Sequence, residues 1–145
     1  GCIPEVLIQI SGNNKEFVTR TFLAVTLAYD IPMVLNGGGT TGTWAKVWRN
    51  LKEYGYGTDA VEVFPCYAPS GKYSGIPEKL RLTEYRNKNG SAILAFCSFG
   101  HEGPVTLSVG ANSAADFETG KALTVKDNIV QFELKKNDFK LIMIK

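Results

Sequence analysis

The hydrophobic pattern of the chain changes near its middle, and this change constrains the fold more than any other feature of the sequence. Before residue 68, short apolar runs alternate with stretches in which apolar residues recur with the period of a helix. After residue 79, short runs that alternate or are apolar throughout follow one another, separated by turn residues at intervals of roughly ten residues. The sequence therefore predicts an α+β fold in two parts, the first with strands and helices in alternation and the second with strands alone.

Three buried strands and a first helix are expected before residue 68. The apolar runs at residues 6–10, 31–35 and 61–67 are short and end at turn residues, which is typical of strands. Apolar side chains crowd one side of residues 17–29, which indicates a helix between the first two strands. Strand, helix and strand in alternation normally give parallel strands joined by right-handed crossovers.

The second helix of this part is predicted over Thr43–Tyr54. Its apolar side chains fall on one helical face, which we expect to pack against a sheet. They are Trp44, Val47, Trp48 and Leu51. We expect the opposite side, with Lys46, Arg49 and Lys52, to face solvent.

An antiparallel sandwich is predicted for residues 80–145, without a helix longer than about two turns. Proline and glycine residues among small and polar ones mark residues 68–79 as a linker. The predicted division is a βαβαβ segment at residues 1–67, the linker at 68–79 and an all-β sandwich at 80–145.

The βαβαβ segment is too small to make a domain by itself, because three parallel strands with two helices leave apolar faces and sheet edges uncovered. Either the segment packs its open side on the sandwich, or it is the last portion of a larger α/β domain. In the second case residues 1–67 are covered by the remainder of a barrel domain or by another chain.

Two sets of segments indicate the kind of larger protein to which this sequence is similar. Residues 22–36 run from a helix into a strand, and Trp44–Tyr54 form the next helix. The later strands and turns lie at residues 91–96, 105–109, 115–121 and 139–144. This order resembles the C-terminal part of a glycoside-hydrolase-like protein, where a (β/α)8 barrel (a TIM barrel) ends and a small β-sandwich follows. The resemblance implies carbohydrate as the ligand of the parent protein, a structural or accessory sandwich, and an extracellular or periplasmic location.

Catalytic carboxylates are missing from the predicted strand ends. Glycoside hydrolysis needs two carboxylates facing each other across the scissile bond, and in a barrel they lie at the C-terminal ends of strands. Those ends carry Ser11-Gly12-Asn13, Asn36-Gly37-Gly38 and Cys66-Tyr67. We therefore expect no catalytic residue here and no hydrolysis by this chain alone, even if it is part of a glycoside hydrolase.

Substrate contacts are predicted at Asn36, Gly37, Gly38 and Tyr67. A side-chain amide at the carboxyl end of a strand can both donate to and accept from sugar hydroxyls, and the glycines let backbone N–H groups approach an anion. Tyr67 adds an aromatic ring beside a glycine-rich loop. The competing explanation is structural: Asn36 caps the following turn and the glycines serve positive φ angles.

Charge and composition exclude several other classes. The chain has 145 residues, with 16 basic and 14 acidic side chains and a net charge of +2, so no large field gathers nucleic acid. Its apolar runs are too short to span a membrane. Three separated cysteines and one histidine, His101, form no metal-ligand pattern, so no metal or other cofactor is expected. Two alternatives stay open: a carbohydrate-binding module, or a small α/β protein that binds a phosphate or nucleotide at the Gly37–Gly39 loop.

Overall fold

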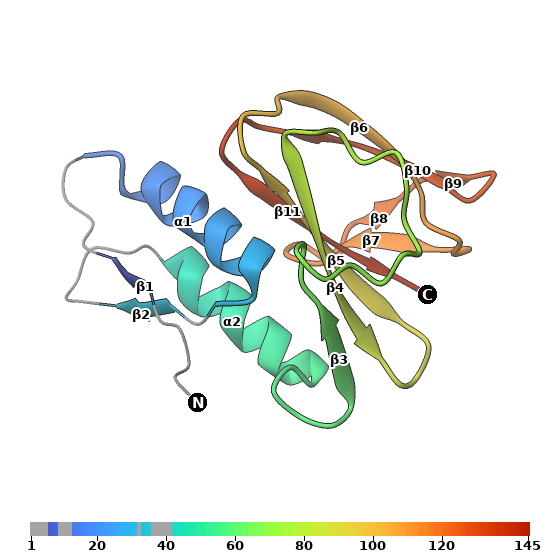
Figure 1. Ribbon diagram of the computed structural model, residues 1–145, viewed down its shortest axis with the longest axis horizontal. Coiled ribbons are helices and arrows are strands. Elements are labelled where there is room, and N and C mark those ends of the chain that lie inside the picture. Colours follow the sequence, from blue (N-terminus) through green and yellow to red (C-terminus); the bar gives the residue numbers. More distant parts are fainter. Residues whose placement is uncertain (1–5, 9–12, 32, 36–41) are drawn as a thin grey trace.

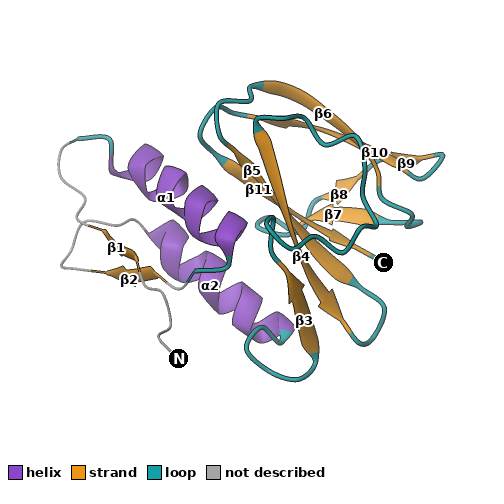
Figure 2. Cartoon of the chain, in the orientation of Figure 1, coloured by secondary structure: helices purple, strands orange, loops and turns teal. Residues whose placement is uncertain are grey.

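A computed structural model describes residues 6–8, 13–31, 33–35 and 42–145. Its elements form layers that can be followed from one side of the molecule to the other (Figure 1). Strands β1 (Val6–Ile8) and β2 (Met33–Leu35) pair in parallel. Helices α1 (Lys15–Tyr29) and α2 (Gly42–Tyr54) lie between this pair and a sandwich of two antiparallel sheets (Figure 2). The predicted α+β fold is confirmed.

The larger sheet of the sandwich has six strands in the order β3-β4-β5-β11-β7-β8. Their bounds are Val61–Phe64, Leu80–Asn87, Ala92–Ser98, Phe139–Ile144, Ala114–Asp116 and Ala122–Leu123, in that order. The smaller sheet has the order β6-β10-β9, with bounds Gly103–Ser108, Ile129–Leu134 and Val125–Lys126. Residues 80–145 are described throughout and contain no helix, as predicted.

Strand β3 differs from the expectation in its partner. The order strand, helix, strand, helix, strand is confirmed, but β3 pairs antiparallel with β4 and belongs to the sandwich. A short apolar run has the same pattern in either sheet, so its pairing could not be deduced from periodicity. Residues 68–79 contain neither helix nor strand and connect two strands of one sheet. The division into separate units at 1–67 and 80–145 stays a prediction.

Strand β5 is the layer that two hydrophobic cores share, because all seven of its residues are buried. Alternate residues point to opposite faces of a strand. One face, with Leu94 and Phe96, packs on the smaller sheet. The other face, with Ile93 and Cys97, packs on the two helices. Its unbroken apolar run thus reflects burial on both sides.

Helix α2 largely follows the predicted amphipathic pattern. Val47 and Leu51 are buried, while Lys46, Arg49 and Lys52 are exposed. The two tryptophans, Trp44 and Trp48, are only half-buried, although they pack against the same core. No helix in the described part of the chain has the length and apolar character needed to cross a membrane.

Candidate functional site

The end of the β1–β2 pair that would carry catalysis in a barrel is the end where the strands finish and the helices begin. The first turns of both helices are joined there, because Thr43 Oγ1 donates a hydrogen bond to Glu16 Oε1 at 2.7 Å. Glu16 is exposed and lies in the first turn of α1. Its carboxylate therefore lies at this end of the helices without belonging to a strand end, the only position for which the sequence pattern made a prediction.

The predicted substrate contacts fall into two places. Asn36, Gly37 and Gly38 lie outside the described residues. Tyr67 lies against Tyr29, the last residue of α1, where the chain turns back toward the start of β2. Their common role in substrate binding stays a prediction.

Tyr67 belongs to a group of three aromatic rings at the surface, which we call the Tyr67 platform and define as Tyr29, Tyr67 and Phe99; Tyr29 is partly buried and packs against the core. The Tyr29 and Tyr67 rings are stacked, with centroids 6.4 Å apart and planes 15° apart, and the Phe99 ring meets Tyr29 edge-on at 6.1 Å. Tyr67 is 69% exposed and Phe99 is 37% exposed. Flat rings open to solvent, with two phenol hydroxyls among them, have the chemistry to stack on a sugar ring and to hydrogen-bond its hydroxyls.

The platform is held in place by bonds between the end of α1 and the sheet. Thr83 Oγ1 donates to the carbonyl of Ala28 at 2.7 Å, and the Cys66 N–H reaches the same carbonyl at 3.1 Å. The last carbonyls of a helix have no partner within the helix, so these donors satisfy one of them. They also fix the loop that carries Tyr67.

A half-buried acid lies at the same helix end. Asp30 follows α1 as its C-terminal cap in the left-handed conformation, with φ of 51°. Burial raises the pKa of its carboxyl group, and a hydrogen bond from Tyr56 only partly offsets this effect. Burial and the nearby carboxylate raise the pKa of Tyr56 in turn. Tyr56 packs edge-on against the buried Tyr85, at 5.6 Å between centroids, so the hydrogen-bond partner of Asp30 lies against the core.

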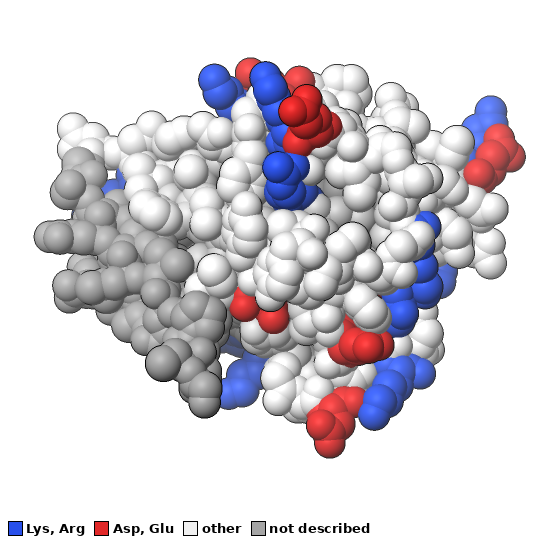
Figure 3. Space-filling view, viewed as in Figure 1, with Lys and Arg blue, Asp and Glu red and all other residues white. Residues whose placement is uncertain are grey.

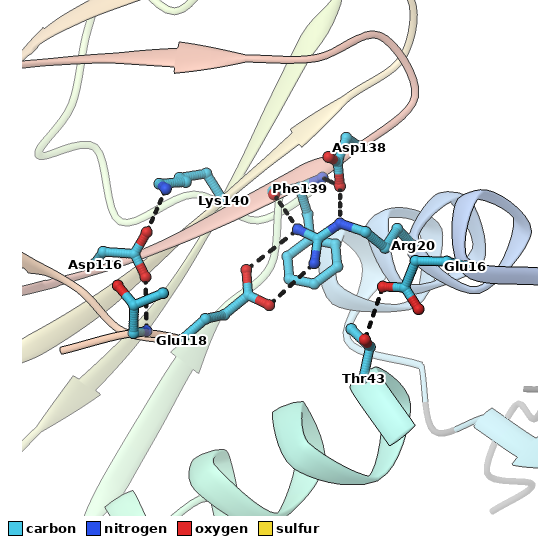
Figure 4. A network of polar contacts seen from close by, with 9 residues as sticks. Glu16, Arg20, Thr43, Asp116, Glu118, Asp138, Phe139 and Lys140 are labelled. Atoms are coloured by element: carbon cyan, nitrogen blue, oxygen red, sulfur yellow. Dashed lines mark hydrogen bonds and ion pairs between the residues drawn. The ribbon is translucent and has the colours of Figure 1, made fainter. Parts of the chain in front are cut away.

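A network of polar contacts joins α1 to the sandwich through Arg20 (Figure 4). Its Nε donates to Asp138 Oδ1 at 2.6 Å, and its two terminal nitrogens donate to the Glu118 carboxylate at 3.1 and 3.2 Å. Nη2 also donates to the carbonyl of Phe139, whose ring lies 4.2 Å from the guanidinium carbon. One side chain thus ties α1 to two carboxylates of the all-β part.

The remaining residues singled out in the sequence have structural surroundings. Cys97 is buried and Cys66 half-buried, and burial raises the pKa of both thiols. His101 is half-buried in a loop. Within the described ranges no three His, Cys, Asp or Glu side chains lie together in a way that could hold a metal ion.

Charged groups on the face shown in Figure 3 form small clusters of both signs, separated by uncharged surface. A polyanion such as nucleic acid binds to a continuous basic surface. The arrangement on this face does not provide one.

Comparison with known proteins gives a likeness of fold. No protein-family model and no curated protein matches the chain. Among solved structures, a GH27 β-L-arabinopyranosidase from Geobacillus stearothermophilus, in complex with arabinose, superposes on 91% of this chain with a TM-score of 0.62 and 13% identity. An α-galactosidase I from Mortierella vinacea covers 95% of it with a TM-score of 0.60 and 14% identity. An Anoxybacillus α-amylase covers 88% with a TM-score of 0.56 and 10% identity.

The chain spans only 31%, 38% and 32% of those three proteins, respectively. Its fold is therefore that of a segment of glycoside hydrolases.

Proposed function

We propose that this chain is the C-terminal segment of a carbohydrate-active, glycoside-hydrolase-like protein. In this proposal β1, α1, β2 and α2 belong to the end of a (β/α)8 barrel, and the β-sandwich braces that end without supplying catalytic carboxylates. The observation that carries the proposal is the parallel β1–β2 pair, which has helices on one side and, among the described residues, no third strand. A two-stranded parallel sheet leaves both edges open, and in a barrel further strands would pair with them.

The ion pairs support the bracing role. Glu118 and Asp138 hold Arg20, Glu84 holds Arg86, and Asp116 holds Lys140. A carboxylate that is committed to a cation in the fold is poorly placed to act as a proton donor or a nucleophile. These acids therefore serve the structure of the sandwich and its contact with α1.

The test is hydrolysis of a panel of aryl glycosides and oligosaccharides, by the chain alone and by the chain with the barrel segment encoded before it. We expect no turnover above background by the chain alone and turnover when the barrel is complete. Glu16→Gln is the critical variant, and Glu53→Gln, which changes an exposed glutamate in the last turn of α2, is its control. Turnover by the chain alone that Glu16→Gln abolishes and Glu53→Gln does not would show that the proposal is wrong.

Direct sugar binding by the chain is a second candidate function, which the Tyr67 platform favours. Two of its three rings, those of Tyr67 and Phe99, are exposed, and a sugar ring can stack on the face of an exposed aromatic ring. Tyr67→Ala removes the most exposed ring and should abolish sugar binding, whereas Phe17→Ala, which removes another exposed ring on α1, should not. Equal affinity of the parent and Tyr67→Ala for a binding sugar would exclude the platform and leave Asn36, Gly37 and Gly38 as the proposed contacts, tested by Asn36→Ala.

A further inference from the structure

A groove of about 710 Å³ lies on the sandwich, away from the helices. It is formed by the loop that precedes β4, the β4–β5 hairpin, the loop after β6 and the end of β11. Small-molecule sites usually have volumes of about 300–1,000 Å³, so the groove is large enough for a short oligosaccharide or another small molecule.

The groove concentrates the positive charge of the chain. Its lining includes the basic side chains of Lys72, Arg86, Lys88 and Lys145 but a single acidic side chain, that of Glu84. The whole sequence has 16 basic and 14 acidic side chains, so the residues outside the groove have 12 basic and 13 acidic ones. The net positive charge of the side chains therefore comes from the groove. None of the three lysines forms an ion pair with a described residue.

Arg86 is held rigidly with one edge of its guanidinium still open. Its Nε and Nη2 each donate to one oxygen of Glu84 at 2.9 Å, and its guanidinium carbon lies 4.3 Å from the centre of the Phe64 ring. A guanidinium has five N–H donors. The edge formed by Nη1 and the second hydrogen of Nη2 therefore remains, without a partner among the described residues. Two parallel donors on one edge match the two oxygens of a carboxylate.

The rest of the lining suits a sugar ring. Ala92, Val109, Ala111 and Ile144 contribute apolar surface, and Tyr73 contributes an aromatic side chain. Tyr73 is partly buried against the inner core of the sandwich. Burial and the neighbouring Glu84 raise the pKa of its hydroxyl to about 12, so the hydroxyl stays protonated and can donate a hydrogen bond at neutral pH.

We propose that this groove binds an acidic saccharide. Its carboxylate would lie on the open edge of Arg86, and its ring would lie against Tyr73 and the apolar floor. The lysines attract the charge and contact further acidic units. The choice of a saccharide as the carrier of the carboxylate rests on the proposed function, whereas the preference for a carboxylate rests on the groove alone.

The experiment is calorimetric titration of the purified chain with a panel of uronic-acid oligosaccharides, built from galacturonate or glucuronate. Neutral oligosaccharides of the same length and linkage, and acetate, serve as comparison ligands. We expect at least one uronate to bind, its neutral counterpart to bind at least tenfold more weakly, and acetate to bind far more weakly than either. The affinity for the uronate should fall as salt rises from about 0.1 M to about 1 M, because the screening length falls from about 10 Å to about 3 Å.

Two variants test the location. Lys88→Gln combined with Lys145→Gln should weaken uronate binding about tenfold, as expected for two charge contacts of about threefold each. Lys121→Gln, at an exposed position outside the groove, should leave it unchanged. Arg86→Lys keeps the charge but loses the open fork, and should weaken binding more than the lysine pair. Circular dichroism on each variant shows whether the fold is intact.

Each other outcome overturns the inference in a distinct way. Equal affinity for acidic and neutral sugars would show that charge is not recognised. Acetate binding as tightly as the uronate would show a simple anion site. Failure of the whole uronate panel, or loss of affinity in Lys121→Gln alone, would exclude the groove. None of these results affects the hydrolysis test, so failure here is distinguishable from failure of the proposed function.

Discussion

Arg20 and Arg86 have the same side-chain chemistry, and each is paired with a glutamate, but their environments differ in how many donors are used. Arg20 uses four N–H groups, toward Asp138, both oxygens of Glu118 and the carbonyl of Phe139. Arg86 uses two, both toward Glu84. Each guanidinium also lies over an aromatic ring, at 4.2 and 4.3 Å.

The difference separates a structural arginine from one that is ready to bind. The Arg20 fork is nearly saturated and lies between two parts of the chain, so its role is to join them. Arg86 is oriented by its partners and still has an open edge beside a groove. The number of donors left over, and not the presence of an ion pair, distinguishes the two roles.

The largest expected effect is that of Arg20→Met on stability. Glu118 and Asp138 are mostly buried, and without the arginine both carboxylates lose their cation. Leaving buried charge without a partner is costly, so we expect the free energy of unfolding to fall by about 3 kcal/mol. Chemical denaturation measures it. Adding Glu118→Gln should restore only part of the loss, because Asp138 remains; a loss below about 0.5 kcal/mol would mean that Arg20 does not join the two parts.

A smaller loss is expected for Arg86→Met, about 1–2 kcal/mol. This variant leaves one carboxylate, that of Glu84, without its cation, whereas Arg20→Met leaves two. Glu84→Gln in the same chain should therefore restore nearly all of the stability. Denaturation of the single and double variants compares the two arginines directly; a larger loss than for Arg20→Met would reverse the distinction drawn above.

The smallest effect is expected at the third ion pair, between Lys140 and Asp116. Its cation is an ammonium group, which lacks the several parallel N–H donors of a guanidinium. Burial raises the pKa of Asp116, but hydrogen bonds from Lys140 and Thr119 outweigh it, and the net pKa lies below the ordinary value. A lowered pKa gives stability that is present above the unfolded pKa, about 4, and is lost as pH falls through the folded pKa. Lys140→Met should thus cost about 0.5–1 kcal/mol near neutral pH.

Denaturation of the parent and Lys140→Met at several pH values measures this contribution. The difference between the two should shrink as pH falls below about 4, because protonated Asp116 no longer needs the cation. Lys121→Met, which removes an exposed lysine near the same strands, is the matched control. A difference that stays constant to the lowest pH would show that packing of the lysine chain, and not its charge, is responsible.

The sequence predicted those features that depend on local periodicity. The helical stripe of Val47 and Leu51 and the apolar run from Ala92 to Cys97 both led to the right elements. The pairing of the strands was harder to predict, because the residues of β3 have the same strand pattern in either sheet. Arg20 could not be singled out at all: its partners lie 98 and 118 residues away, and no spacing rule links such positions. Likewise the groove assembles residues from 72 to 145 through topology alone.

The burial of β5 on both faces has a consequence for how the protein can be divided. Ile93, Ala95 and Cys97 lie against the helices, while Leu94 and Phe96 lie against the smaller sheet, one residue apart along the same backbone. Neither core can lose its order without disturbing the strand that the other needs, so the two cores should open together in hydrogen exchange, as one cooperative unit. A sandwich excised at residue 80 would expose an apolar sheet face of the kind that promotes aggregation. If this region were transferred from one protein to another during evolution, the two helices and the sandwich would therefore have to be transferred as one unit.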